Sequence, residues 1–237
     1  MIKHYLLAAA SLLSLGSLSA QNVNVQLHYD LGRKLNGQDQ AERPQLTTTV
    51  ELFRADKWGN TFFFVDMDYR REGVTSAYWE ISREFRLGKL PINLHLEYNG
   101  GLSNSFSYKN AYLAGLTYAY NRRDYSAGFT LTPMYKYLAR QDRPDSWQLT
   151  GTWYLNLAGG LCTFNGFADL WGDRHFVTGK NTTIFITEPQ LWLNLNKLPG
   201  VDPAFRLSVG TEVEISSNFA AMDKTIINPT LALKWTF

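Results

Sequence analysis

Residues 23–31 read VNVQLHYDL, and apolar and polar side chains alternate through the whole stretch. In a β-strand, successive side chains point to opposite faces of the sheet. One face of this segment is therefore apolar, and the other carries Asn24, Gln26, His28 and Asp30. The stretch predicts a strand that lies between an apolar medium and a polar one.

The same alternation continues to the end of the chain and predicts about twelve strands. The expected strands cover residues 23–31, 45–54, 60–70, 75–86, 91–100, 110–120, 125–137, 146–157, 161–171, 183–194, 204–215 and 225–237. Most are about 10 to 13 residues long, which exceeds the usual five or six of soluble sheets and fits a tilted bilayer crossing. No apolar stripe with helical spacing follows Gln21.

The composition excludes several classes of protein. The 237 residues include 23 Lys and Arg against 21 Asp and Glu, and 14% of them are aromatic. A chain with so many aromatic residues is not disordered. Its balanced charge gives no basic surface for binding a nucleic acid. The single cysteine, Cys162, has no partner for an internal disulfide, and no Cys/His cluster has the spacing of a zinc site.

The first residues have the layout of a secretory signal peptide. A basic start is followed by an apolar segment from Tyr5 to Leu18 and by the small residue Ala20. The apolar segment is shorter than the roughly 20 residues of a membrane helix. We therefore expect residues 1–20 to be removed after export across the inner membrane, which leaves 21–237 as a single domain.

Three features favour a membrane barrel over a soluble β-sandwich or a lipocalin-like barrel. The polar face of the strands is very polar and rich in carboxylates. Tyr and Trp lie near many strand ends on the apolar face, as in the interfacial girdles of a membrane barrel. The last strand ends at apolar-facing Phe237, which is typical of chains delivered to the outer-membrane insertion machinery. A soluble periplasmic β-protein is the alternative.

Strands can span a bilayer only if their sheet closes, because an open edge would leave unpaired amides in lipid. The sequence therefore predicts an all-β fold, a transmembrane antiparallel up-and-down β-barrel in the bacterial outer membrane. An even number of strands places both termini in the periplasm. We expect the barrel to be surrounded by outer-membrane lipid.

Four short stretches carry a resemblance to a known family. Residues 56–66 read DKWGNTFFFVD, residues 78–85 read YWEISREF, and residues 95–101 and 110–113 read HLEYNGG and NAYL. They resemble the Tsx-type nucleoside-specific channel-forming proteins of the outer membrane, and most of all an uncharacterised branch of that family. The resemblance implies a twelve-stranded monomeric barrel with a narrow channel for nucleosides.

The polar face of the strands mixes carboxylates with aromatic rings. Rings stack on flat bases or sugars, and carboxylates accept hydrogen bonds from hydroxyl and amino groups. A phosphorylated nucleotide suits such a lining poorly, because its acidic groups outnumber its basic ones. The residues that we expect to contact a solute are Phe62, Phe64, Asp66, Asp68, Glu80, Glu97, Asp169 and Trp192. Alternatively, the carboxylates form structural ion pairs with Arg206 or Lys234, and the rings plug the lumen.

Catalytic and metal chemistry find little support in the sequence. An outer-membrane phospholipase needs His and Ser on its lipid-facing wall, whereas His28 and His95 fall on the inward face. Each has a carboxylate two residues on, Asp30 or Glu97, but a solvated histidine in a polar lumen explains these pairs better than a metal site does. We therefore expect no enzyme activity, no metal and no cofactor. Arg83 falls on the apolar face, where it either snorkels from a strand end or marks a break in register.

The sequence as a whole predicts a channel for the passive uptake of small polar solutes, most of all nucleosides or similar ring compounds. The alternative is a closed barrel with a structural or surface-binding role and no transport.

Overall fold

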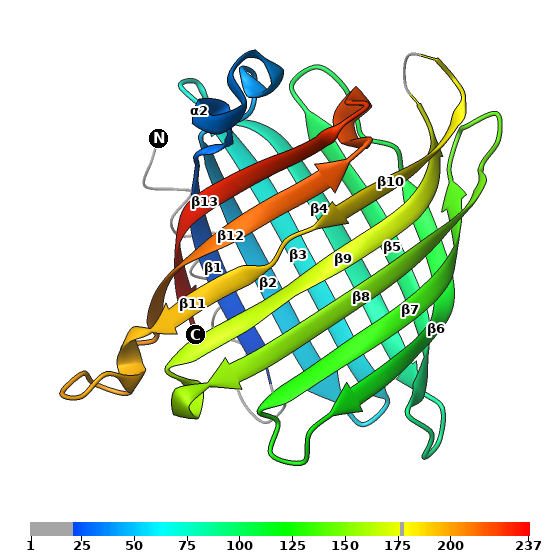
Figure 1. Ribbon diagram of the computed structural model, residues 1–237. Helices are drawn as coiled ribbons and strands as arrows, with labels where there is room; N and C mark the ends of the chain where they lie inside the picture. Colours follow the sequence, from blue (N-terminus) through cyan, green and yellow to red (C-terminus); the bar gives the residue numbers. More distant parts are fainter. Residues whose placement is uncertain (1–20, 176–177) are drawn as a thin grey trace.

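The computed structural model describes residues 21–175 and 178–237 (Figure 1). The expected signal peptide, residues 1–20, lies outside the described residues. Within the described part of the chain, 13 strand segments form one antiparallel sheet. They are β1 (Gln21–Asp30), β2 (Leu46–Asp56), β3 (Gly59–Arg70), β4 (Gly73–Arg86), β5 (Ile92–Ser103), β6 (Ala111–Asn121), β7 (Ala127–Leu138), β8 (Asp145–Leu157), β9 (Cys162–Arg174), β10 (Asn181–Thr187), β11 (Gln190–Asn194), β12 (Leu207–Ser217) and β13 (Thr225–Thr236).

The sheet closes on itself because β1 pairs with β13, for example at Val25 with Trp235. Two of the segments, β10 and β11, share one place in the wall, since both pair with β9 and with β12. The described residues therefore form a barrel of 12 strand positions, which confirms the predicted fold class and strand number.

The strand expected at residues 183–194 is interrupted in its middle by Glu188 and Pro189. Proline lacks an N–H and cannot donate to the sheet, so it marks an irregularity. The neighbouring β9 adapts through Gly166, where a Cβ atom would lie 2.5 Å from the carbonyl oxygen of Glu188. Glycine at this position lets the two backbones approach closely.

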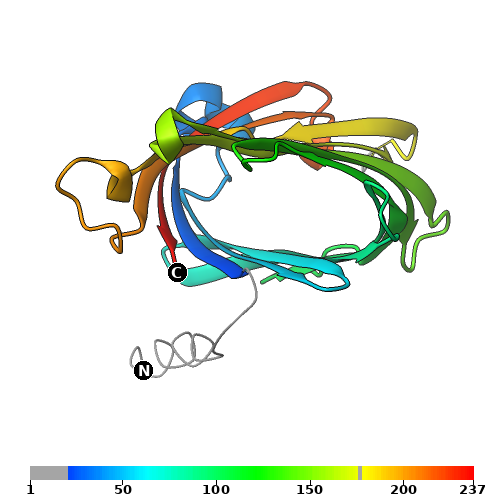
Figure 2. The same ribbon diagram turned by 90° about the horizontal axis from the view of Figure 1, so that it is seen from below.

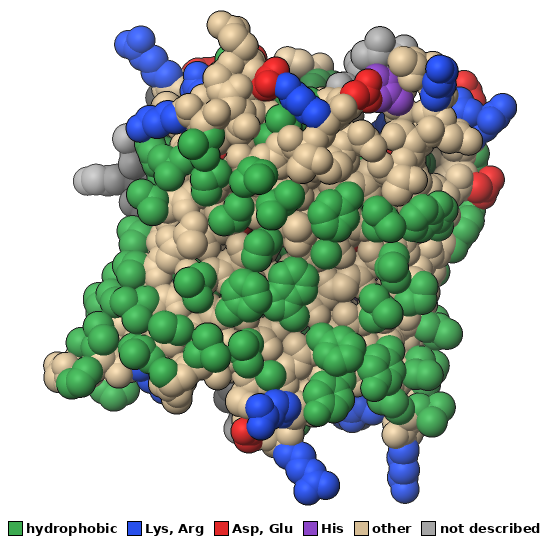
Figure 3. Space-filling model, in the orientation of Figure 1, with side chains coloured by type: hydrophobic (Ala, Val, Ile, Leu, Met, Phe, Trp, Pro, Cys, Tyr) green, Lys and Arg blue, Asp and Glu red, His purple; other side chains and the backbone are tan. Residues whose placement is uncertain are grey.

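Apolar side chains cover the face of the outer wall seen in Figure 3, and charged side chains gather at the two ends of the barrel. Leu27, Leu131, Leu231 and Leu233 are each more than two-fifths exposed, although they lie in the middle of strands. On the inner face, Gln26 and His28 are buried. The alternation predicted from the sequence is therefore the observed one, and the apolar band suits the hydrocarbon of a bilayer.

The outward-facing Arg83 is matched by an acidic partner. Its guanidinium contacts both carboxylate oxygens of Asp56 at 2.8 and 2.9 Å, and it donates to Thr61 Oγ1 at 3.0 Å. The pairing between β3 and β4 runs without interruption past this point. No break in register is needed, because a local ion pair near the strand ends satisfies the charge.

Seen from below, the ring of strands is flattened, so that two long walls face each other (Figure 2). β1 begins and β13 ends at one end of the barrel, which we call the terminal end (Figure 1). At the other end lies the short helix α2 (Gly32–Asn36), and we call this the α2 end. Among the described residues, no helix has the length and apolar character needed to cross a membrane.

Candidate functional site

The eight residues predicted to contact a solute all lie on the inner face of the barrel. The register shows why several of them share a level: Asp66 on β3 stands opposite Thr49 on one side and Tyr78 on the other. Phe64 pairs in the same way with Glu80. The residues come from five strands, β3, β4, β5, β9 and β11.

Aromatic rings form a continuous ladder inside the barrel. Its members are Phe62, Phe64, Tyr78, Tyr108 and Phe106, with consecutive ring centroids 6.0, 6.1, 6.0 and 5.3 Å apart. The ladder begins three residues into β3 at the terminal end. It reaches the β5–β6 connection at the α2 end, where Phe106 is exposed.

A glycine makes room for the upper part of this ring ladder. Gly101 lies opposite Tyr78 on β5, and a Cβ atom there would stand 2.5 Å from a ring carbon of Tyr108. The amide of Tyr108 also donates to the carbonyl of Gly101 at 3.0 Å. Sequence reasoning found the rings on the strands but missed Tyr108 and Phe106, because a connection has no periodic pattern to reveal which way its side chains point.

Three of the predicted carboxylates gather across the flattened lumen, and we call Glu80, Glu97 and Asp169 the lumen acid cluster. Glu80 interacts electrostatically with both of the others, although β4 and β9 belong to opposite long walls (Figure 1). One oxygen of Glu80 accepts from the hydroxyl of Tyr78 at 2.7 Å, which joins the cluster to the ring ladder. Asp169 accepts from Thr150 Oγ1 at 2.5 Å.

The lumen acid cluster is only partly satisfied by its neighbours. His95 stands between two carboxylates, with Nδ1 2.7 Å from Glu84 and Nε2 3.0 Å from Glu97. The second oxygens of Glu84 and Glu97 and the side-chain oxygen of Asn99 are buried without a hydrogen-bond partner. Such groups are rare in folded proteins, and each calls for an explanation.

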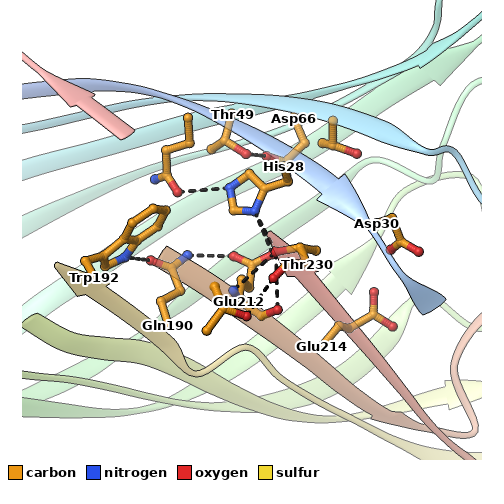
Figure 4. A network of polar contacts seen from close by, with 12 residues as sticks. His28, Asp30, Thr49, Asp66, Gln190, Trp192, Glu212, Glu214 and Thr230 are labelled. Atoms are coloured by element: carbon orange, nitrogen blue, oxygen red, sulfur yellow. Dashed lines mark hydrogen bonds and ion pairs between the residues drawn. The ribbon is translucent and has the colours of Figure 1, made fainter. Parts of the chain in front are cut away.

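A second polar network fills the part of the lumen between β1 and β11 (Figure 4). His28 contacts Gln26 at 3.1 Å and Thr230 at 3.2 Å, and Gln190 donates to Glu212 at 2.6 Å. Most of its polar atoms have partners, so this network ties the walls together. It includes Asp66, which accepts from Thr49 at 2.5 Å.

Trp192 belongs to this same packed region. Its side chain is 0% exposed, its indole N–H donates to Gln190, and its ring lies between His28 and the ammonium group of Lys234. The ring has no free face for a solute in this conformation. Asp68 is likewise occupied, since it accepts hydrogen bonds from Thr47 and Ser76 at 2.7 Å each.

The lumen also contains an apolar cluster that the sequence reasoning did not foresee. Ala111, Leu113, Met134 and Leu138 are buried together on the inner faces of β6 and β7. In this part of the wall, the side chains on the inner face are apolar, like those on the outer face. The signal that identifies lumen-facing residues is therefore lost there.

The connection between β1 and β2 folds back into the barrel mouth through Arg43. Its guanidinium contacts Asp30 at 2.6 Å and Glu214 at 2.7 Å. Burial acts against the charge, but Glu214 and Asp30 outweigh it and hold the pKa of Arg43 above its ordinary value. Arg43 therefore stays charged and fastens this connection to β1 and β12.

Neither histidine lies in an arrangement suited to a metal ion. Within the described residues, no group of three or more His, Cys, Asp and Glu side chains is able to hold one. His28 contacts an amide and a hydroxyl and lies 3.6 Å from a Glu212 oxygen, and His95 bridges two carboxylates.

Comparison with known proteins assigns the family. The family model described as "Domain of unknown function (DUF5020)" matches residues 20–237. The chain belongs to the DUF5020 family. No curated protein matches the sequence.

Two solved structures share the fold of this DUF5020 barrel. The structure titled "KdgM porin" is 10% identical with a TM-score of 0.52, and the comparison covers 91% of this chain and 99% of that one. The NanC porin is 9% identical with a TM-score of 0.58, covering 91% of this chain and 100% of that one. At such low identity the likeness concerns the fold alone. It shows that the DUF5020 chain has the barrel fold of these two porins, and it does not bear on nucleosides.

Proposed function

We propose that this DUF5020 barrel is a passive outer-membrane channel for small polar solutes, with nucleosides and similar ring compounds as its cargo. The observation that carries the proposal is the ring ladder, which follows the lumen from the terminal end to the α2 end beside a row of carboxylates. Successive rings about 6 Å apart let a flat solute pass from one stacking partner to the next.

The chemistry of the lining supports a polar ring compound in particular. Stacking on an aromatic side chain is worth about 1–3 kcal/mol per base, and it acts on the face of the ring. Carboxylates such as Glu80 accept hydrogen bonds from the edge of the same solute. A channel must bind its cargo weakly enough to release it, and a row of equivalent rings meets this requirement better than one deep pocket does.

The same proposal covers the route and surroundings of the protein. Export directed by residues 1–20 and insertion through the last strand, ending at Phe237, deliver the chain to the outer membrane. The apolar band then contacts lipid, and a single chain closes the barrel, so a monomer suffices.

A closed barrel with a structural or surface-binding role is the second candidate. It is favoured by the apolar cluster of Leu113, Met134 and Leu138 and by the network around His28, because both fill parts of the lumen. These groups lie to either side of the ring ladder, however, and do not include its members.

Recording from planar bilayers separates the two candidates. Refolded protein is added at low concentration, and the current is measured in KCl before and after addition of uridine or adenosine. Discrete current steps that the nucleoside reduces are expected for the channel. A flat current at high protein load, with the protein shown to be inserted by heat-modifiable gel migration, would contradict transport and support the closed barrel.

A further inference from the structure

The lumen acid cluster leaves several of its acceptors without a partner. In the network around His28, most polar atoms are paired along one strand or across to the next, and the side-chain oxygen of Asn165 beside Gln190 is an exception (Figure 4). In the acid cluster, one oxygen of Glu97 and the side-chain oxygen of Asn99 have no partner, although the Glu97 side chain is 8% exposed and Asn99 is 4% exposed. A buried oxygen without a hydrogen-bond partner is unfavourable, so these two oxygens point to a hydrogen-bond donor that is not part of the protein chain.

The free acceptors surround one level of the lumen. Asn99 pairs across the strands with Glu80, and Glu97 is two residues away on the same face of β5. Asp169 reaches the same space from the opposite wall, where it interacts electrostatically with Glu80 and Glu97. The missing donor therefore lies between the two long walls rather than inside one of them.

The charge of this region favours a cation. Four carboxyl groups, those of Glu80, Glu84, Glu97 and Asp169, stand against two basic side chains. Lys136 is already engaged, since it donates to Gln148 at 2.7 Å and lies 4.9 Å from the ring centre of Trp171. His95 is shared between Glu84 and Glu97. Acidic groups in a low-dielectric wall attract cations and repel anions.

The spacing of the side chains points to an organic cation rather than a metal ion. The His, Cys, Asp and Glu side chains of the described residues include no group close enough together to hold a metal. An ammonium group has diverging N–H donors and reaches carboxylates that stand farther apart. Phe64 lies opposite Glu80 on the neighbouring strand, and Tyr78 donates to Glu80, so a ring attached to the ammonium would meet the ring ladder.

We propose that Glu80, Glu97 and Asp169, with Asn99, form a cation-selective constriction that binds a compact organic ammonium ion, whose attached ring stacks on Phe64 and Tyr78. Because such a constriction acts only in a conducting lumen, this proposal rests on the proposed channel function. Cation–π attraction from the two rings adds to the charge of the carboxylates.

The first test is the ion selectivity of the wild-type channel. In a tenfold KCl gradient, the reversal potential should have the sign of K⁺ permeation, with K⁺ favoured over Cl⁻ by about tenfold, as expected for a cleft lined by one sign of charge. A reversal potential near zero, or one that favours Cl⁻, would overturn the constriction and leave the channel function standing. Absence of any conductance would instead contradict the channel function itself.

The second test uses three probes that share a benzene ring and differ in charge: benzylammonium, benzamide and benzoate. Each is added to one chamber, and the reduction of the K⁺ current is measured. The expected order of block is benzylammonium first, benzamide second and benzoate last. Equal block by all three would show that the rings alone select the solute and would overturn the cation site.

Variants locate the effect in the cluster. The double substitution Glu97→Gln and Asp169→Asn should lower the K⁺ over Cl⁻ permeability ratio by about threefold per charge removed, as expected for charges several ångströms away in a partly aqueous lumen. It should weaken block by benzylammonium but not by benzamide. The matched control is the double substitution Glu72→Gln and Asp202→Asn in the exposed β3–β4 and β11–β12 connections, which removes the same number of carboxylates from exposed connections. An equal change in both variants would overturn the assignment to the cluster.

Folding is checked by heat-modifiable gel migration. If the double variant fails to fold, Glu97→Gln alone is measured by the same reversal potential, and an unchanged permeability ratio in that variant also counts against the proposal.

Discussion

Arg83 and Asp56 form a two-point ion pair on the outer wall of the barrel, with N–O distances of 2.8 and 2.9 Å. The pair lies at the terminal end of the apolar band, where the turn between β2 and β3 begins. Asp56 also accepts from the backbone N–H groups of Trp58 and Gly59, so one carboxylate holds both the turn and the guanidinium.

This relationship predicts an asymmetry between single and double substitutions. Asp56→Ala leaves the charge of Arg83 unpaired next to lipid, where an arginine is unfavourable. The midpoint of urea unfolding in lipid vesicles should therefore fall more in Asp56→Ala than in the double variant Asp56→Ala with Arg83→Leu. If the double variant is the less stable of the two, the pair does not serve to neutralise a lipid-facing charge.

Gly101 offers a test of the ring ladder. Gly101→Ala places a methyl group 2.5 Å from the ring of Tyr108 and 2.6 Å from the carbonyl oxygen of Ala77, and such overpacking typically costs about 1–3 kcal/mol. We expect Tyr108 to be displaced and the block of current by adenosine to weaken. The matched control is Gly151→Ala, because the nearest atom to a Cβ there is 3.8 Å away. Equal behaviour of the two variants would remove Tyr108 from the solute path.

Phe64 is the ring that most directly joins the ladder to the lumen acid cluster. Phe64→Ala removes a stacking partner worth about 1–3 kcal/mol, so the affinity for a nucleoside should fall by about tenfold. Phe129→Ala removes an equivalent ring from the outer wall, where Phe129 is 45% exposed. That control should lower stability without changing nucleoside block. The affinity of each variant for the nucleoside is obtained from the current reduction measured at increasing nucleoside concentrations.

The ion pairs of Arg43 are expected to hold the β1–β2 connection against the barrel. Arg43→Met leaves Asp30 and Glu214 without their cation and should lower the free energy of unfolding by about 2 kcal/mol. This is less than the 3–5 kcal/mol of a dry buried pair, because the Arg43 side chain is 24% exposed.

Limited trypsin digestion at Arg33 and Lys34, in the neighbouring α2, should also become faster in Arg43→Met. Arg122→Met is the control, since the pair of Arg122 with Asp124 is exposed, lies in the β6–β7 connection and contributes at most about 1 kcal/mol. A digestion rate that rises equally in both variants would mean that Arg43 does not hold the connection in place.

The fold was largely predictable from the sequence because a membrane barrel repeats one rule. Each strand must show an apolar side to lipid, so β1, β3 and β8 can be assigned to faces from their alternation alone. The rule is lost where the lumen is itself apolar, as at Leu113 and Met134. Pro189 did carry a local signal for the break between β10 and β11, since proline cannot donate to the sheet.

The candidate site was predictable in its composition but not in its arrangement. The alternation placed Glu80, Glu97 and Asp169 on the inner face, yet nothing in it shows that strands from opposite walls bring them together. That proximity depends on the flattened outline of the barrel (Figure 2). The contacts of His95 with Glu84 and of Arg83 with Asp56 likewise join side chains through strand pairing that the sequence leaves unspecified.

The central claim is that the inner face of this barrel is wet and its outer face contacts lipid. Phe64 and Val65 are adjacent residues on opposite faces of β3, and Cys162 is the only cysteine of the chain. Phe64→Cys and Val65→Cys, each made in a Cys162→Ser background, are reconstituted in vesicles and treated with a charged, membrane-impermeant thiol reagent. The account predicts modification at position 64 and protection at position 65 until the protein is unfolded. Modification at position 65 with protection at position 64 would contradict it.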